Sequence, residues 1–270
     1  MNYLHSGPLT SLINNRTLIY QLSKREILSR YKGTSFGIAW SIFTPLLMLV
    51  LYTFVFSFVF KARWGESNEL PREIYALVLY TGMITHALFC DCLVRSSTLM
   101  HANVSYVKKV VFPLEVLNWV VLFSSIFQTF IGFTLLVLAV IFITGSISIY
   151  VLFIPLILLP LCMLIMGVSW FVASMGVYFR DLAQLTTIAS TVLMFASPIF
   201  YPTSMLPESI RVYIYLNPLT YFIEAFRSVL IWKTAPSFES IIIVYLISFV
   251  VAFLGFKFFQ RTRKGFSDVL

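Results

Sequence analysis

Charge is what this 270-residue chain has least of. Only 11% of its residues are Asp, Glu, Lys or Arg, whereas 59% are hydrophobic and the mean hydropathy is +0.91. A soluble globular chain carries about 25% charged residues, so this chain lacks the polar surface that would face water on all sides. The composition excludes a soluble globular protein and predicts an integral membrane protein.

Motifs for nucleotide, metal and nucleic-acid binding are also missing. There is no G-x-x-x-x-G-K-[ST] sequence, which excludes nucleotide binding through a P-loop, and we expect no cofactor on this chain. The three cysteines, Cys90, Cys92 and Cys162, lie in or beside apolar runs and predict neither a metal site nor a disulfide. The basic residues form no cluster on a soluble domain, so no nucleic-acid partner is expected.

One pattern resembles a catalytic motif. His86 and Asp91 form an H-x4-D pair of the kind that some acyltransferases use. On a helix, residues five apart point about 140° away from each other, and nothing else completes a site. We expect Asp91 to pair instead with Arg95, one helical turn further on, and we assign no catalytic residue.

The stretch YTFVFSFVF places an aromatic ring at every second position, which by itself indicates a strand. However, no charged residue lies between Lys32 and Lys61, and this run is too long for a single membrane strand of about 9–11 residues. We therefore predict a helix, on which Tyr52, Phe56 and Phe60 form one stripe.

The same reasoning predicts an all-α integral membrane fold in one domain, residues 1–270. Six transmembrane helices are expected at about 37–60, 74–94, 114–143, 150–179, 182–202 and 240–257. Residues 203–238 are too polar to cross and too apolar for a free loop, which favours two short re-entrant helices split at Asn217-Pro218. Glu224 and Arg227, spaced i,i+3, are placed to pair on the second of them. The basic arm before the first span is either a helix along the membrane surface or an anchor that only sets topology.

Basic residues predict the orientation. Thirteen of the 19 Lys and Arg residues lie on the side that carries the N-terminal arm, the 95–112 loop and the tail. That side is expected to be cytoplasmic, with both termini there and the chain in a bacterial cytoplasmic (inner) membrane.

Five short motifs occur in order between these spans: KREILSRYKGTSFGIAWSIFTPLL, VKKVVFPLEVL, YFRDLAQL, ASPIFYP and LNPLTYFIEAFR. Together they resemble the membrane subunit of ABC-2 type exporters, closest to the branch that moves O-antigen, teichoic acid or capsule chains. The resemblance implies a homodimer with two copies of a separate ATPase subunit, which would bind ATP and Mg, and a lipid-linked polysaccharide as cargo. Membrane lipid is the remaining partner.

The resemblance also implies roles for particular residues. The arm around Lys24 to Tyr31 would be an interface helix, residues 102–110 a coupling helix, and Pro113 the start of the third span. The coupling set is then Lys24, Arg25, Glu26, Arg30, Ala102, Asn103, Val104, Tyr106, Lys108, Lys109, Pro113, Glu115, Arg180 and Asp181. Asn217, Pro218, Glu224 and Arg227 would belong to an outer gate.

Aromatic rings stack on the C–H faces of sugars and bind them only weakly. A polymer channel needs many such weak contacts, because one tight site would stop the polymer from moving. We therefore expect Tyr52, Phe56, Phe60, Phe195, Phe200 and Tyr201 to line the path, although lipid-facing rings are the alternative. Two other functions stay open: an ABC-2 exporter for another cargo, such as a lipo-oligosaccharide or drug, and a membrane-bound acyltransferase.

Overall fold

The computed structural model describes residues 7–55, 72–108 and 112–270, and within them every regular element is a helix. Phe56, Phe60 and Lys109 lie outside these ranges. Five helical segments are long and apolar enough to cross a membrane: Gly37–Val55, Ile74–Ala102, Glu115–Thr144, Ile149–Tyr178 and Phe238–Val269. The all-helical membrane fold is thereby confirmed. The expected fifth span contains the shorter apolar helix α8 (Leu182–Ala196), so the count of six crossings stays a prediction.

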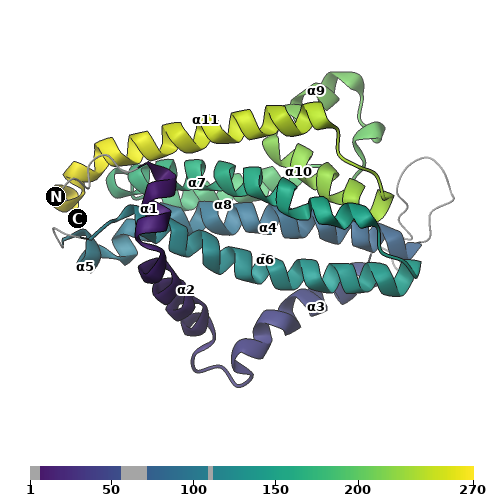
Figure 1. The fold of residues 1–270 in the computed structure, drawn as a ribbon, viewed down its shortest axis with the longest axis horizontal. Helices are drawn as coiled ribbons and strands as arrows, with labels where there is room; N and C mark the ends of the chain where they lie inside the picture. The colour runs from purple at the N-terminus through teal and green to yellow at the C-terminus, as the bar shows by residue number, and fades with distance from the viewer. Residues whose placement is uncertain (1–6, 56–71, 109–111) are drawn as a thin grey trace.

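Four helices run alongside α8 as a bundle (Figure 1): α4 (Arg72–Ala102), α6 (Glu115–Thr144), α7 (Ile154–Tyr178) and α11 (Phe238–Thr262). Helix α4 is the core of the bundle, because 78% of its most apolar window is buried, against 22–39% for the corresponding windows that contain α6, α7 and α11. The outer helices therefore leave apolar faces for lipid or for another subunit, as expected in a bilayer.

Glycine permits the closest helix contacts. A Cβ on Gly167 would overlap the backbone at Val251, and one on Gly255 would overlap the backbone at Gly167, so α7 and α11 meet backbone to backbone. At the other crossing, a Cβ on Gly176 of α7 would overlap the Ser97 carbonyl of α4. Small residues at such crossings let helices approach closely where lipid supplies no hydrophobic drive.

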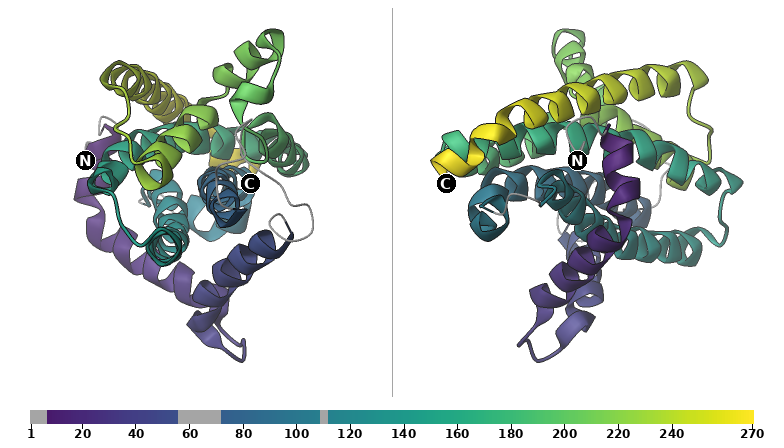
Figure 2. Two further views of the ribbon diagram at one scale, coloured as in Figure 1. Left: turned by 90° about the vertical axis from the view of Figure 1, so that its right-hand side faces the viewer. Right: turned by 60° about the vertical axis from the view of Figure 1, so that its left-hand side comes forward.

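The N-terminal arm leaves this bundle and returns to it (Figure 1). After α1 (Pro8–Asn14), helix α2 (Arg16–Tyr31) runs obliquely outward, and α3 (Trp40–Tyr52) turns back toward the bundle. The elbow between them holds Gly33 and Gly37, both with positive φ, and a 3-10 turn at Gly37–Ala39. Seen along the bundle, α2 and α3 lie on its outside (Figure 2). The arm is thus helical, as one of the two interpretations of the sequence requires.

The two ends of the bundle differ. The C-terminus and α5 (Val104–Val107) lie at one end, and the α6–α7 turn and α9 lie at the other (Figure 1). We call these the terminal end and the far end. At the far end, Gly145 closes α6 with φ 68°. The remaining elements are η4 (Ile149–Phe153), η5 (Thr203–Met205), α9 (Glu208–Leu216), α10 (Pro218–Arg227), η6 (Ser228–Trp232), η7 (Arg263–Gly265) and α12 (Phe266–Val269).

Candidate functional site: two polar clusters at opposite ends of the bundle

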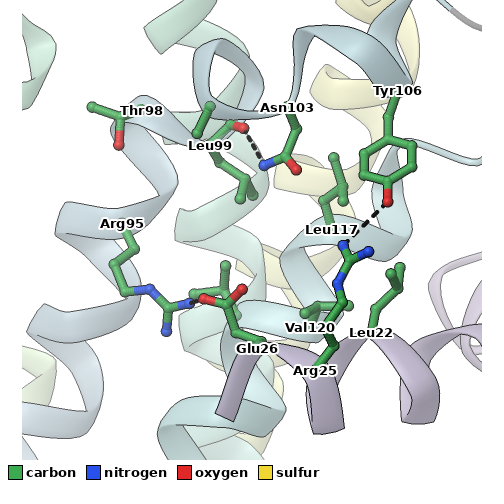
Figure 3. A pocket seen from close by; sticks show the side chains of 12 residues that line it. Leu22, Arg25, Glu26, Arg95, Thr98, Leu99, Asn103, Tyr106, Leu117 and Val120 are labelled. Atoms are coloured by element: carbon green, nitrogen blue, oxygen red, sulfur yellow. Dashed lines mark hydrogen bonds and ion pairs between the residues drawn. The ribbon is translucent and has the colours of Figure 1, made fainter. Parts of the chain in front are cut away.

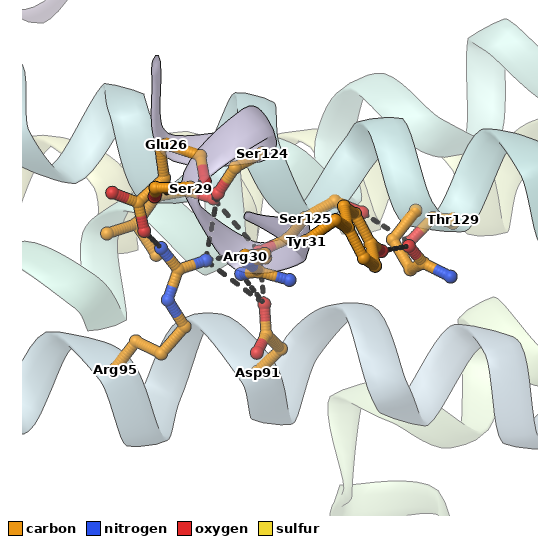
Figure 4. A network of polar contacts seen from close by, with 11 residues as sticks. Glu26, Ser29, Arg30, Tyr31, Asp91, Arg95, Ser124, Ser125 and Thr129 are labelled. Atoms are coloured by element: carbon orange, nitrogen blue, oxygen red, sulfur yellow. Dashed lines mark hydrogen bonds and ion pairs between the residues drawn. The ribbon is translucent and has the colours of Figure 1, made fainter. Parts of the chain in front are cut away.

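A network of four charges joins α2 to α4, and we call it the charged cluster: Glu26, Arg30, Asp91 and Arg95 (Figure 4). Arg30 Nη2 lies 3.2 Å from Asp91 Oδ2, and Arg95 Nη1 lies 3.3 Å from the same oxygen. Arg95 Nη2 also binds Glu26 Oε1. On α2 and on α4 the two charged residues are four positions apart, so they lie on one face of their helix. Each face carries one acid and one base, so each acid meets a base of the other helix.

Helix α6 completes the charged cluster with two hydroxyls. Ser125 Oγ donates to Asp91 Oδ2 at 2.5 Å, and Ser124 Oγ accepts from Arg95 Nη1 at 2.8 Å. The four charged side chains keep 22–38% of their surface exposed, so each ion pair stabilises the fold by about 1 kcal/mol or less. The network as a whole still specifies one register of α2 on the bundle, because every carboxylate and guanidinium has a partner on another helix.

Further side chains tie α2 to its neighbours on either side. Tyr31 Oη donates to Gln128 Oε1 on α6 at 2.8 Å, and Gln128 Nε2 donates to the Ser41 carbonyl at the start of α3 at 3.0 Å. Arg25 Nη2 donates to Tyr106 Oη on α5 at 3.1 Å. Helix α2 is therefore hydrogen-bonded directly to α5 and α6, and Gln128 links it to the start of α3.

A pocket of about 300 Å³ lies between α2, α4, α5 and α6, with Arg25, Glu26, Arg95 and Asn103 among its lining residues (Figure 3). Asn103 interrupts the helix between α4 and α5, and its Nδ2 donates to the Leu99 carbonyl at 2.9 Å. The pocket therefore lies where residues of α2, α4 and α6 meet the junction of α4 with α5.

Most of the expected coupling residues do gather at the terminal end. Lys24, Ala102 and Lys108 are exposed, as are Arg180 and Asp181 in the turn between α7 and α8, whereas Val104 and Tyr106 are half-buried in α5. Glu26 and Arg30 instead point toward α4, into the charged cluster. Pro113 does not begin the third span, because α6 begins at Glu115 and the Pro113 carbonyl accepts from the Val116 N–H at 3.0 Å.

Glu115 is 3% exposed and pairs with Arg263 of the C-terminal turn at 2.9 Å. This contact ties the start of α6 to the end of the chain. The sequence did not lead us to predict this pair, or the pairs Arg30–Asp91 and Glu26–Arg95. The predicted depth of these charges, near the same membrane edge, was a signal that could have indicated that they pair.

The second cluster lies around Arg227, which is fully buried at 0% exposure. Its Nε donates to the Val78 carbonyl of α4 at 3.0 Å, and its Nη2 donates to the Ile199 carbonyl at 3.1 Å. Its Nη1 donates to the Pro198 carbonyl at 2.6 Å and to Glu224 Oε1 at 2.9 Å. The predicted pairing of Glu224 with Arg227 is confirmed.

This arginine explains how α8 ends so early. Helix α8 stops at Ala196, and the following turn leaves the carbonyls of Pro198 and Ile199 without helical partners. Buried carbonyls without partners are costly, and the planar guanidinium fork satisfies both. Gly82 makes room for it, because a Cβ there would lie 3.1 Å from Arg227 Nη2.

Asn217 joins the same region and divides the re-entrant segment, as the sequence predicts. It ends α9, and its Oδ1 accepts from the Leu219 N–H at 3.0 Å to cap α10, whose first residue is Pro218. Its Nδ2 donates to Ser197 Oγ at 2.9 Å and to the Ala196 carbonyl at 3.2 Å. The end of α8 and the start of α10 are thereby held together.

Two of the described aromatic residues of the expected path, Tyr52 and Phe200, pack against α4, and Phe195 and Tyr201 lie beside Phe200 in sequence or in space. The Phe195 ring, 61% exposed, lies 5.9 Å from the Phe200 ring, and Tyr201 Oη donates to the Phe195 carbonyl at 2.8 Å. Tyr52 and Phe200 both pack against the α4 cluster of Tyr75, Val78 and Leu79. Tyr52 is half-buried and lines a separate pocket of about 200 Å³ between α3, α4 and α6.

The H-x4-D pair is not brought together as a catalytic site. His86 Nε2 lies 3.0 Å from the Ser190 carbonyl of α8 and 3.2 Å from Cys90 Sγ. Asp91 belongs to the charged cluster, and its predicted pairing with Arg95 is confirmed.

These features define a helical membrane subunit whose helical arm is clamped to the core helix at the terminal end and whose re-entrant helices are anchored at the far end. Comparison with known proteins gives the family: residues 17–231 match the ABC-2 type transporter family, and the chain belongs to it. It is 27% identical to the O-antigen export system permease protein RfbA of Klebsiella pneumoniae, covering 94% of this chain and 95% of that one. It is 22% identical to the RfbA permease of Myxococcus xanthus, covering 95% and 96%. The capsule polysaccharide export inner-membrane protein CtrC of Neisseria meningitidis is 25% identical, covering 98% of both chains.

Proposed function

We propose that this chain is the transmembrane subunit of an ATP-driven exporter that carries a lipid-linked polysaccharide, of the O-antigen type, across the cytoplasmic membrane. The observation that carries the proposal is the end-to-end similarity to O-antigen export permeases, which covers 94–95% of this chain. The cargo is the finer part of the proposal, because CtrC and a polysialic acid transport protein, KpsM of Escherichia coli, are similar over 98% and 92% of the chain. Capsule polysaccharide is therefore the second candidate.

The chain is proposed to work as a homodimer on two copies of a separate ATPase subunit, which bind ATP and Mg. This division of labour agrees with the missing P-loop. The terminal end is the cytoplasmic side, as the excess of Lys and Arg predicts, so both termini face the ATPase. The exposed residues Lys108, Arg180 and Asp181 are the proposed contact points there.

Force from the ATPase reaches the span helices by two routes in this proposal. One passes through α5 and the following turn into the start of α6 at Glu115. The other passes through α2 and the charged cluster into α4, which is the most buried helix. A displacement of α2 then moves α4 with it, and α2 does not slide over the bundle. The reason is that the Glu26, Arg30 and Tyr31 side chains each bind a partner on the bundle.

The aromatic residues flanking α4 are the proposed lining of the path. Replacing Tyr52, Phe56 and Phe60 together by Leu is expected to lower export and to leave assembly and ATP hydrolysis intact. Export measured as surface polysaccharide in whole cells tests this. Unchanged export places that stripe against lipid.

An affinity purification of the tagged chain from native membranes tests the whole proposal. The expected result is a stoichiometric partner that carries a P-loop, together with lipid-linked glycan in the same preparation, whose composition separates O-antigen from capsule. If the chain purifies alone under conditions that keep a control exporter intact, the proposal is refuted.

A further inference from the structure

The elbow between α2 and α3 encloses a groove of about 910 Å³. Three cations line it, Lys24, Arg25 and Lys32, together with polar and apolar residues that include Gln21, Leu28 and Ile38. Among the described residues that line the groove there is no carboxylate, because Glu26 on α2 turns the other way to meet Arg95. The groove therefore combines three cations and Leu28 along α2 and at its C-terminal end with an apolar wall at Gly37 and Ile38, where the elbow leads into α3.

Two of these cations form no ion pair with any residue that the structure describes. Within residues 7–55, 72–108 and 112–270, neither the Lys24 nor the Lys32 ammonium forms an ion pair, and both side chains are exposed. Arg25 donates to the neutral Tyr106 hydroxyl, and within the described part of the chain it too forms no ion pair with a carboxylate. Three charges around one concave surface call for an anionic ligand.

The aromatic residues of the elbow indicate its depth in the membrane. Phe36, Trp40 and Phe43 form a ring trio with centroids 5.6–6.4 Å apart, and Phe36 and Phe43 are 69% and 53% exposed. Trp is enriched at the level of the lipid headgroups, and the half-buried Trp40 packs edge-to-face against both exposed Phe rings. The groove shares this elbow, through Gly37 and Ile38, and so lies at headgroup depth.

We propose that the groove binds the phosphate headgroup of an anionic phospholipid, such as phosphatidylglycerol, from the leaflet on the terminal side. Lys24, Arg25 and Lys32 hold the phosphate, and Leu28 and Ile38 border the start of the acyl chains. A bound lipid would brace the angle between α2 and α3. The occupant is a membrane lipid rather than free phosphate because the apolar wall continues toward α3, whose surface is almost wholly exposed and apolar.

The test is native mass spectrometry of the purified full-length protein, with its partner if one co-purifies, released from nanodiscs that contain phosphatidylcholine and phosphatidylglycerol. The variant is Lys24→Gln/Lys32→Gln, and the matched control is Arg261→Gln/Lys264→Gln, which removes two exposed charges from the tail. The wild type is expected to retain phosphatidylglycerol in preference to phosphatidylcholine. Removal of two charges near an anionic headgroup weakens that preference by about 30-fold, whereas the control stays within about twofold.

A Lys24→Arg/Lys32→Arg variant is expected to keep the lipid, which separates charge recognition from misfolding. Equal retention in all variants overturns the proposal, and so does equal loss in the variant and the control. The proposal is also overturned if the variant keeps phosphatidylglycerol but loses lipid-linked glycan or the ATPase, since the groove then serves cargo or partner. None of these readouts requires export, so failure here is distinct from failure of the proposed function.

Discussion

Arg227→Met is the most informative single substitution that the structure offers. Methionine fills similar space without a charge, so the change isolates the hydrogen bonds of the guanidinium from its packing. It leaves the Pro198 and Ile199 carbonyls without their donors and Glu224 without its cation.

The expected loss follows from these contacts. Removing one partner of a buried ion pair costs about 3–5 kcal/mol, and each orphaned buried carbonyl costs about 1–3 kcal/mol. Glu224 keeps 36% of its side-chain surface exposed and is partly rehydrated, which favours the lower end, at about 3 kcal/mol. For a domain of this size, such a loss corresponds to a decrease in Tm of about 10 °C.

The assay is thermal unfolding of the purified protein in mild detergent, followed by size-exclusion chromatography of the remaining folded fraction. Arg211→Met is the matched control, because Arg211 on α9 donates only to the Ser204 and Leu206 carbonyls in a more open setting. We expect that control to lose about 1 kcal/mol or less. If Arg227→Met and Arg211→Met lower Tm equally, the buried Arg227 guanidinium does not hold α8, α10 and α4 together.

Three further predictions concern other contacts, and thermal unfolding of the same kind measures each. Arg95→Gln should cost about 1–2 kcal/mol and Glu26→Gln about half of that, and the double variant should lose less than the sum, because the two charges share one contact; strict additivity would argue against the clamp. Gly167→Ala should cost about 1–3 kcal/mol by forcing α7 away from α11. Gly132→Ala should be tolerated, because a Cβ there meets only side-chain atoms of Ile84 and Tyr80 and no backbone. Equal effects of the two substitutions would contradict the close crossing. Asn217→Ala should cost about 1 kcal/mol through the lost α10 cap, and no change would mean that the cap is dispensable.

Stability and function are separable in these variants. A variant that unfolds at lower temperature but still exports at permissive temperature identifies a structural contact. A variant such as Arg95→Gln that keeps its folded fraction, binds its ATPase and fails to export identifies a contact that transmits movement. The charged cluster is the place where we expect the second outcome, since it joins the arm to the most buried helix.

Much of the fold is readable from local sequence patterns. Uncharged runs longer than a membrane strand predict helices, and the bilayer makes that inference strong because backbone groups must be paired within each segment. The split at Asn217-Pro218 and the pairing of Glu224 with Arg227 also follow from local rules, since proline favours the first turn of a helix and i,i+3 residues share a face. Asp91 with Arg95 is of the same kind.

The partners across helices are a different matter. Nothing local indicates that Arg227 meets Val78, 149 residues away, or the carbonyls of Pro198 and Ile199. Glu26 and Arg95 are 69 residues apart, and each alone looks like an ordinary charge at a membrane edge. The early end of α8 also depends on residues far away in the chain. A helix can end inside the apolar region only where another element supplies hydrogen-bond donors to the carbonyls that have lost their helical partners.

The sequence by itself therefore determined the class of protein, the helices and the contacts made within one or two turns, because those depend on segment length, apolar content and the 3.6-residue period. Only the tertiary structure decided which charges meet, which span is most buried and which cations gather in the elbow groove. The physical reason is that such contacts depend on how all the helices pack together. Close backbone contacts at glycines such as Gly167 and Gly176 fix the distances between helices, and these distances decide which side chains can reach each other.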